Sequence, residues 1–96
     1  MSGPSPTIVL YTKPGCGLCD EARTILNALL VERAADGRPT APIDERNILT
    51  DEAWQRAYSL EIPVVEVGGR RLGLATSPAR LRRLLAETLD GVQAGA

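Results

Sequence analysis

Two cysteines, three residues apart, lie where one hydrophobic pattern gives way to another. Residues 7–12 (Thr-Ile-Val-Leu-Tyr-Thr) form a continuous β-branched and apolar run, which is typical of a buried parallel strand. Pro14 and Gly15 interrupt that run. From Gly17 to about Ala34, apolar residues then recur at spacings of three and four, which predicts an amphipathic helix. A Cys-x-x-Cys pair at such a junction is typical of a thiol-disulfide site.

The position of each cysteine on the predicted helix suggests its role. Cys16 falls at the helix start, where unpaired backbone N–H groups and the helix dipole stabilise a thiolate, so it is the candidate nucleophile. Cys19 lies on the adjacent turn and is the candidate resolving thiol. Lys13, the only lysine, favours the Cys16 thiolate, whereas Asp20 and Glu21 oppose it. We therefore expect a milder lowering of the Cys16 pKa than in strongly oxidising enzymes.

The middle of the chain predicts a second strand and a second helix. Residues 41–48 hold only two strong apolar side chains, so a strand there would suit the edge of a sheet. Thr50 or Asp51 can cap a helix that runs to about Tyr58. The inner face of that helix is expected to carry Ala53, Trp54, Ala57 and Tyr58.

The C-terminal third predicts a hairpin and a last helix. Residues 61–67 form a strand with a proline at its beginning, and the pair Gly68-Gly69 closes a hairpin with residues 70–74. Ser77 can cap a helix that has Pro78 at its first position and ends at Asp90-Gly91. The resulting order β-α-β-α-β-β-α predicts an α/β fold with a four-stranded mixed sheet flanked by three helices.

Composition limits the possible functions. The 96 residues suffice for one domain, residues 7–90, with flexible tails at 1–6 and 91–96. The net charge of −1 leaves no broad basic face for nucleic acid, and no apolar run approaches the roughly 18 residues of a membrane span. The N-terminus lacks the pattern of a secretory signal, so we expect a protein of the cytoplasm. We also expect it to be a monomer. In that reducing compartment, paired cysteines are more often catalytic, redox-sensing or metal-binding than structural.

The string Lys13-Pro-Gly-Cys-Gly-Leu-Cys-Asp-Glu-Ala22 carries a family resemblance. Together with the Ile62-Pro63 pair and the Gly68-Gly69 hairpin, it resembles the small glutaredoxin-like proteins of the thioredoxin-fold superfamily over roughly residues 7–90. The resemblance implies a thioredoxin-like fold and a dithiol oxidoreductase that reduces protein disulfides or glutathione mixed disulfides. It also implies a cis bond between Ile62 and Pro63, facing the active site and turning the backbone of Ile62 toward an extended substrate.

The resemblance also suggests substrate contacts. In the glutaredoxins, a Gly-Gly pair followed by Ser/Thr-Asp positions glutathione at the start of the last helix. Here the corresponding stretch, residues 73–77, has leucine in place of one glycine and Ser77 in place of the acid. A protein partner, or recycling by a thioredoxin-reductase-like donor, is therefore credible beside glutathione as reductant, and no bound cofactor is expected. The candidate contacts for substrate or glutathione are Tyr11, Lys13, Ile62, Pro63, Thr76 and Ser77.

Other interpretations of the cysteine pair and its surroundings stay open. The pair could be inert and retained for packing, and the domain could be a redox-sensing or partner-binding module or carry an iron–sulfur cluster shared between two chains. A zinc site needs four ligands, whereas this chain has two cysteines and no histidine. A copper chaperone also has a Cys-x-x-Cys after its first strand, but Pro14 and the Ile62-Pro63 strand fit that class poorly. Thr76 and Ser77 are first of all candidate helix caps.

Overall fold

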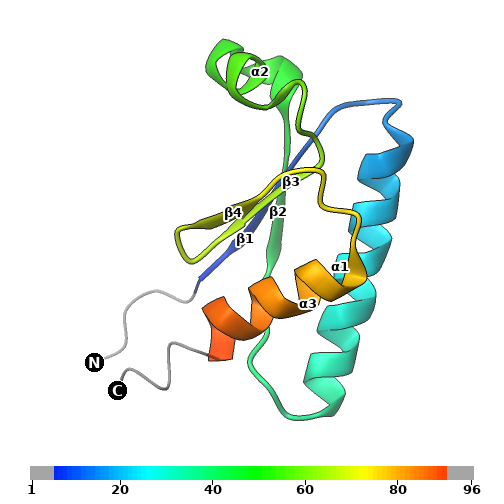
Figure 1. Ribbon diagram of the computed structural model, residues 1–96, viewed down its shortest axis with the longest axis vertical. Coiled ribbons are helices and arrows are strands. Elements are labelled where there is room, and N and C mark those ends of the chain that lie inside the picture. Colours follow the sequence, from blue (N-terminus) through cyan, green and yellow to red (C-terminus); the bar gives the residue numbers. More distant parts are fainter. Residues whose placement is uncertain (1–5, 91–96) are drawn as a thin grey trace.

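The computed structural model describes residues 6–90, and the expected tails lie outside that range except for Pro6. The element order matches the order predicted from the sequence (Figure 1). The strands are β1 (Ile8–Thr12), β2 (Ile43–Asn47), β3 (Val64–Val67) and β4 (Arg70–Leu72). The helices are α1 (Gly17–Ala35), α2 (Glu52–Tyr58) and α3 (Pro78–Leu85), together with a 3-10 turn η1 (Ile48–Thr50) and a π-helical turn η2 (Ala86–Asp90).

The strands form one mixed sheet in the order β2-β1-β3-β4. β1 pairs in parallel with β2 and antiparallel with β3, and β3 pairs antiparallel with β4. The structure therefore confirms the predicted central first strand and the predicted edge position of the second. Gly68 and Gly69 close the hairpin with φ values of +58° and +78°, a backbone conformation that glycine adopts without steric cost.

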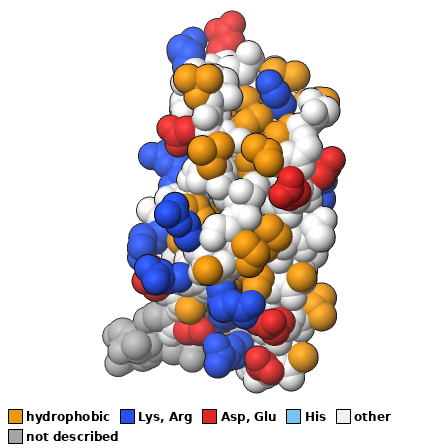
Figure 2. Space-filling model, turned by 45° about the vertical axis from the view of Figure 1, so that its right-hand side comes forward, with side chains coloured by type: hydrophobic (Ala, Val, Ile, Leu, Met, Phe, Trp, Pro, Cys, Tyr) orange, Lys and Arg blue, Asp and Glu red, His pale blue; other side chains and the backbone are white. Residues whose placement is uncertain are grey.

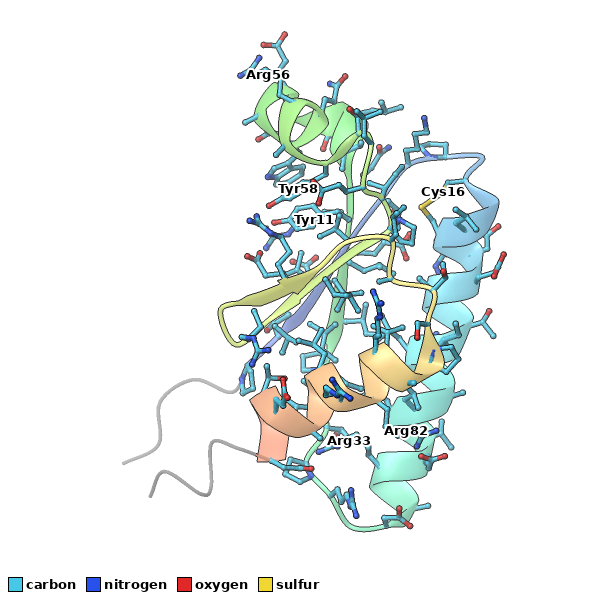
Figure 3. The ribbon with its side chains drawn as sticks, in the orientation of Figure 1. Tyr11, Cys16, Arg33, Arg56, Tyr58 and Arg82 are labelled. Carbon is cyan, nitrogen blue, oxygen red and sulfur yellow. A yellow bond between two sulfur atoms is a disulfide. The ribbon has the colours of Figure 1, made fainter. Side chains whose placement is uncertain are left out.

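The sheet has a different layer on each face because successive strand residues point to opposite sides. Ile8, Leu10, Val65 and Val67 pack on one side with the apolar residues of α1 and α3. Tyr11 and Val64 point to the other side and pack with Tyr58 of α2. α2 lies at the end of the sheet where β2 finishes and β3 begins, far from α3 (Figure 1). The Cys-x-x-Cys motif lies at that same end, at the start of α1 (Figure 3).

Three details of the sequence prediction were wrong, and the first is that the last strand ends at Leu72 rather than at residue 74. Ala53 and Ala57 are exposed, so the inner face of α2 consists of Trp54 and Tyr58, which are four residues apart on a helix of only two turns. The third strand begins at Val64 rather than at residue 61. The N–H groups of Glu61 and Ile62 donate to Tyr58 O at 2.8 and 3.0 Å and close the end of α2, so they do not pair with β1.

A buried arginine fixes the far end of α1. The Arg33 side chain is only 8% exposed; its Nε donates to Pro39 O at 2.7 Å, and its guanidinium forms an ion pair with Asp90. These contacts join the end of α1 to the loop before β2 and to the end of the last helix. None of the helices in residues 6–90 is both long and apolar enough to cross a membrane.

Candidate active site

The two cysteines form a disulfide across the first turn of α1, with Cα atoms 5.2 Å apart (Figure 3). Cys16 is the N-cap residue of α1, with the extended dihedrals φ −97° and ψ 106°. The Cys19 N–H donates to Cys16 Sγ at 3.1 Å. Cys16 is partly exposed, whereas Cys19 is 1% exposed. Only the Cys16 sulfur is therefore both accessible and directed at the helix N-terminus, where backbone donors favour a thiolate.

A charged network borders the motif on the side of β2. Arg23 donates to Asp20 Oδ1 at 2.7 Å and to the two oxygens of Glu45 at 2.8 and 2.6 Å. Thr12 Oγ1 donates to the same carboxylate at 3.0 Å. The hydrogen bond from Arg23, aided by Thr12, lowers the pKa of Glu45 below its usual value. Because Arg23 partly compensates the charge of Asp20, that acid opposes a Cys16 thiolate less than the sequence suggested.

Lys13 is exposed at the rim of this network. It lines an open hollow beside the disulfide loop, together with Thr12, Pro14, Gly15, Asp20, Arg23, Glu45 and Asn47. The hollow holds both signs of charge next to the motif. A role for Lys13 in substrate contact stays a prediction.

Tyr11 lies behind the disulfide rather than at the surface. Its ring is 4% exposed, lies 4.3 Å from the Tyr58 ring and 5.6 Å from the Trp54 ring, and belongs to the cluster that contains both cysteines. Burial raises the pKa of Tyr11, and nearby Tyr58 and Glu66 raise it further. The Tyr58 hydroxyl accepts a hydrogen bond from Arg71 at 3.0 Å. Tyr11 thus packs beneath the motif, and its predicted contact with substrate stays a prediction.

The Ile62–Pro63 peptide bond is cis, as the family resemblance implied. Ile62 is 8% exposed and belongs to the same cluster as Cys16 and Cys19. Pro63 O accepts a hydrogen bond from Ala75 N at 2.8 Å, and Glu61 O accepts one from Leu74 N at 2.7 Å. These bonds hold the segment before α3 against the Ile62–Pro63 pair.

Ser77 is the N-cap of α3, because its Oγ accepts a hydrogen bond from Arg80 N at 3.2 Å. The predicted cap is confirmed for Ser77 but not for Thr76, whose N–H donates to Leu74 O at 2.8 Å. The structure thus brings together Cys16, Cys19, Tyr11 and Ile62 in one cluster and attaches the segment of Thr76 and Ser77 to its edge. Their contacts with substrate stay predictions.

Sequence reasoning missed three residues beside the motif. Arg23 follows Cys19 by four positions and so shares its helical face, which is a signal that could have been used. Glu45 meets Arg23 only because β2 pairs in parallel with β1, opposite Leu10. Leu74 has a φ of +48° and is 58% exposed. A leucine stands here in place of a family glycine, and that replacement could have indicated the positive φ.

A second groove lies away from the disulfide, between β4 and the outer face of α3. It is lined by Arg70, Arg71, Leu72, Arg80, Arg83, Leu84 and Glu87. Figure 2 shows basic side chains gathering on the side of β4 and α3. Arg70 pairs with Glu87 at 2.9 Å. Within residues 6–90, no three side chains of cysteine, aspartate or glutamate come close enough to hold a metal ion.

The fold and the disulfide define the class of protein. A four-stranded mixed sheet, with a Cys-x-x-Cys pair at the start of the first helix and a cis-proline before the third strand, is the architecture of the thioredoxin-like fold.

Comparison with known proteins names the family. The model of the Glutaredoxin-like domain (DUF836) matches residues 7–89, and the chain belongs to that family. The X-ray structure of target protein XcR50 from X. campestris is similar, with 30% sequence identity and a TM-score of 0.67. That match covers 85% of this chain and 99% of XcR50. No curated protein sequence matches this chain significantly.

Proposed function

We propose that this domain is a thiol-disulfide oxidoreductase that reduces disulfides by dithiol exchange. The observation that carries the proposal is the asymmetry of the cysteine pair. Cys16 is partly exposed and accepts the Cys19 N–H at the start of α1, whereas Cys19 is buried. This is the arrangement expected of an attacking thiolate backed by a resolving thiol.

The exchange has two steps. The Cys16 thiolate attacks one sulfur of the substrate disulfide, the substrate S–S bond breaks, and one substrate thiolate leaves as a mixed disulfide forms on Cys16. The Cys19 thiolate then attacks Cys16 Sγ, the mixed disulfide breaks, and the second substrate thiolate leaves. The substrate gains two electrons and the protein ends with the Cys16–Cys19 disulfide.

A thiol donor must then return two electrons to the protein. Glutathione and a thioredoxin-reductase-like donor are the two candidates, and both operate in the reducing cytoplasm, where we place the protein as a monomer. Substrate contacts are assigned to Lys13, Ile62, Pro63, Thr76 and Ser77 around the motif, with Tyr11 supporting it from below.

The test is a coupled disulfide-reduction assay with each candidate donor in turn. The wild-type protein should turn over, Cys16→Ser should abolish turnover, and Cys19→Ser should reduce it less. Val31→Ala, at an exposed position in the C-terminal half of α1, serves as the control and should retain full activity. An inert wild-type protein that becomes brown after anaerobic iron–sulfur reconstitution would instead favour a cluster carrier.

A further inference from the structure

Leu74 combines two unfavourable properties at one position. Its backbone is in the left-handed region, with φ +48°, and in residues 6–90 it is the one non-glycine residue with positive φ. That conformation disfavours a leucine because its Cβ crowds the following carbonyl. Its side chain is also 58% exposed and belongs to neither core cluster. Packing of the fold therefore does not account for a leucine here.

The surrounding backbone fixes this conformation. Leu74 N–H donates to Glu61 O at 2.7 Å, and Leu74 O accepts the Thr76 N–H at 2.8 Å, so both polar backbone groups of Leu74 are used. The neighbouring Gly73 fits closely against the same segment, because a Cβ added there would lie 2.9 Å from Glu61 Oε1. Strained residues that the neighbouring structure holds in place are concentrated at binding and catalytic sites.

Leu74 is held next to the candidate active site. Its bond to Glu61, and the bond from Ala75 N to Pro63 O at 2.8 Å, place it along the Ile62–Pro63 pair. Ile62 in turn packs in the cluster that contains Cys16 and Cys19. An apolar side chain is thus presented to solvent beside the backbone that flanks the disulfide.

We propose that Leu74 docks an apolar side chain next to the cysteine of a polypeptide substrate. This inference rests on the proposed oxidoreductase function and specifies its substrate class. An exposed leucine gains free energy when it buries apolar surface against another apolar group. A small polar thiol offers no such group, whereas a polypeptide with a leucine or similar residue beside its cysteine does. Leu74 is therefore a specificity-determining residue. The loss of stability that its positive φ causes is retained because its side chain contacts the substrate.

Stability and specificity should change in opposite directions when Leu74 is replaced. Leu74→Gly and Leu74→Asn introduce at position 74 residues that tolerate a positive φ. Because this relieves the backbone strain, the melting temperature should rise by about 3 °C. Glycine also gives the unfolded chain more freedom, which offsets part of the gain, so Asn provides a second measure of the strain. A melting temperature that falls in both variants would overturn the strain argument.

Specificity is measured with two disulfide-ring peptides that are identical except for Leu or Ser beside one cysteine. Protein reduced beforehand supplies both electrons, so single-turnover rates need no external donor. The wild-type protein should react about fivefold faster with the Leu peptide than with the Ser peptide. A ratio of about that size is expected from the free energy of burying one additional apolar contact. The ratio should fall below about twofold in Leu74→Gly and Leu74→Asn and persist in Leu74→Met. Val31→Ala, which removes apolar surface elsewhere on the protein, should keep the wild-type ratio.

Failure of this inference is distinguishable from failure of the proposed function. Equal rates with both peptides in the wild-type protein, or an unchanged ratio in Leu74→Gly, would overturn the docking role while leaving the oxidoreductase intact. If the wild-type protein reduces neither peptide, the proposed function fails, and docking is judged by NMR titration with cysteine-free versions of the peptides. Larger shifts of the Leu74 amide signal with the Leu peptide would then support docking, and equal shifts would overturn it.

Discussion

The two sulfur atoms of the disulfide differ in exposure, because Cys16 is partly exposed and Cys19 is buried. Cys16 is the N-cap of α1 and accepts a backbone N–H, a donor that we expect to stabilise a thiolate on this sulfur once the disulfide is reduced. Cys19 lies inside the turn against Tyr11 and Ile62, where a substrate cannot approach but Cys16 can. The difference in exposure between the two sulfur atoms follows from the position of each residue on one helical turn.

The Asp20–Arg23 pair should tune the Cys16 thiolate. Arg23→Ala leaves the Asp20 charge uncompensated, so the pKa of Cys16 should rise, whereas Asp20→Asn should lower it. Both groups are substantially exposed, so each titration midpoint should move by about half a pH unit. The measurement is the thiolate absorbance of the reduced protein as a function of pH.

A distant variant provides the control for this titration. Arg38→Ala removes an equal charge from the far end of α1 and should leave the Cys16 midpoint in place. Midpoints that move in the same direction in Arg23→Ala and Asp20→Asn would contradict the electrostatic account.

The sequence predicted the chemistry of single residues better than their partners. The structure places Cys16 at the N-cap of α1 and Cys19 on its first turn, as the spacing predicted, and their proposed roles rest on those positions. The contact of Arg23 with Glu45 depends on the register of β2 on β1, and the two residues are 22 positions apart in the sequence. The backbone of Leu74 is held by its hydrogen bond to Glu61 O, and the sequence hinted at its positive φ only through the replacement of a family glycine.

Among the helices and strands, α1 is held by side-chain contacts near both of its ends. At its start, Arg23 bridges to Glu45 of β2, and at its last turn Arg33 reaches Pro39 and Asp90. The helix that begins at Cys16 is therefore attached to the sheet and to the end of the last helix. The seven-residue α2 instead depends on Trp54 and Tyr58, and on Asp51 Oδ1, which accepts capping bonds from Ala53 N and Trp54 N at 2.8 and 3.1 Å.

Loss of the Arg33 anchor should destabilise the whole domain. Arg33→Ala leaves Asp90 and Pro39 O without their donor, which should lower the free energy of unfolding by about 2–3 kcal/mol. Arg38→Ala, an exposed arginine of the neighbouring turn, should change it by less than about 0.5 kcal/mol. Urea unfolding measures both values. Similar losses in the two variants would show that the buried ion pair adds nothing.

The pattern of elements was predictable because most local signals agree with the fold. β1, α1 and α3 carry clear periodicity, and Ser77 with Pro78 marks the start of α3 as observed. The start of β3 was misplaced because Ile62 continues the apolar run of β3 in the sequence, whereas the N–H groups of Glu61 and Ile62 complete the end of α2. Local pattern cannot distinguish these two uses of the backbone N–H groups.

In the whole molecule, the two faces of the sheet pack against different clusters of side chains. The face under α1 and α3 holds the main apolar core. The cluster on the opposite face, with Tyr11, Tyr58 and Ile62, packs against the cysteines. The disulfide therefore lies at the end of the sheet where α1, α2 and the Ile62–Pro63 segment meet, with only its Cys16 side exposed.

The most direct test of this account is to trap the first exchange step. Reduced Cys19→Ser protein is mixed with an oxidised disulfide peptide, quenched in acid and digested for mass spectrometry. The account predicts one peptide adduct, on Cys16, that dithiothreitol removes. In the matched Cys16→Ser variant, the buried Cys19 should form the adduct at least tenfold more slowly, on the order expected for a thiol without access or thiolate stabilisation. Adducts that form equally fast in both variants, or in neither, would contradict it.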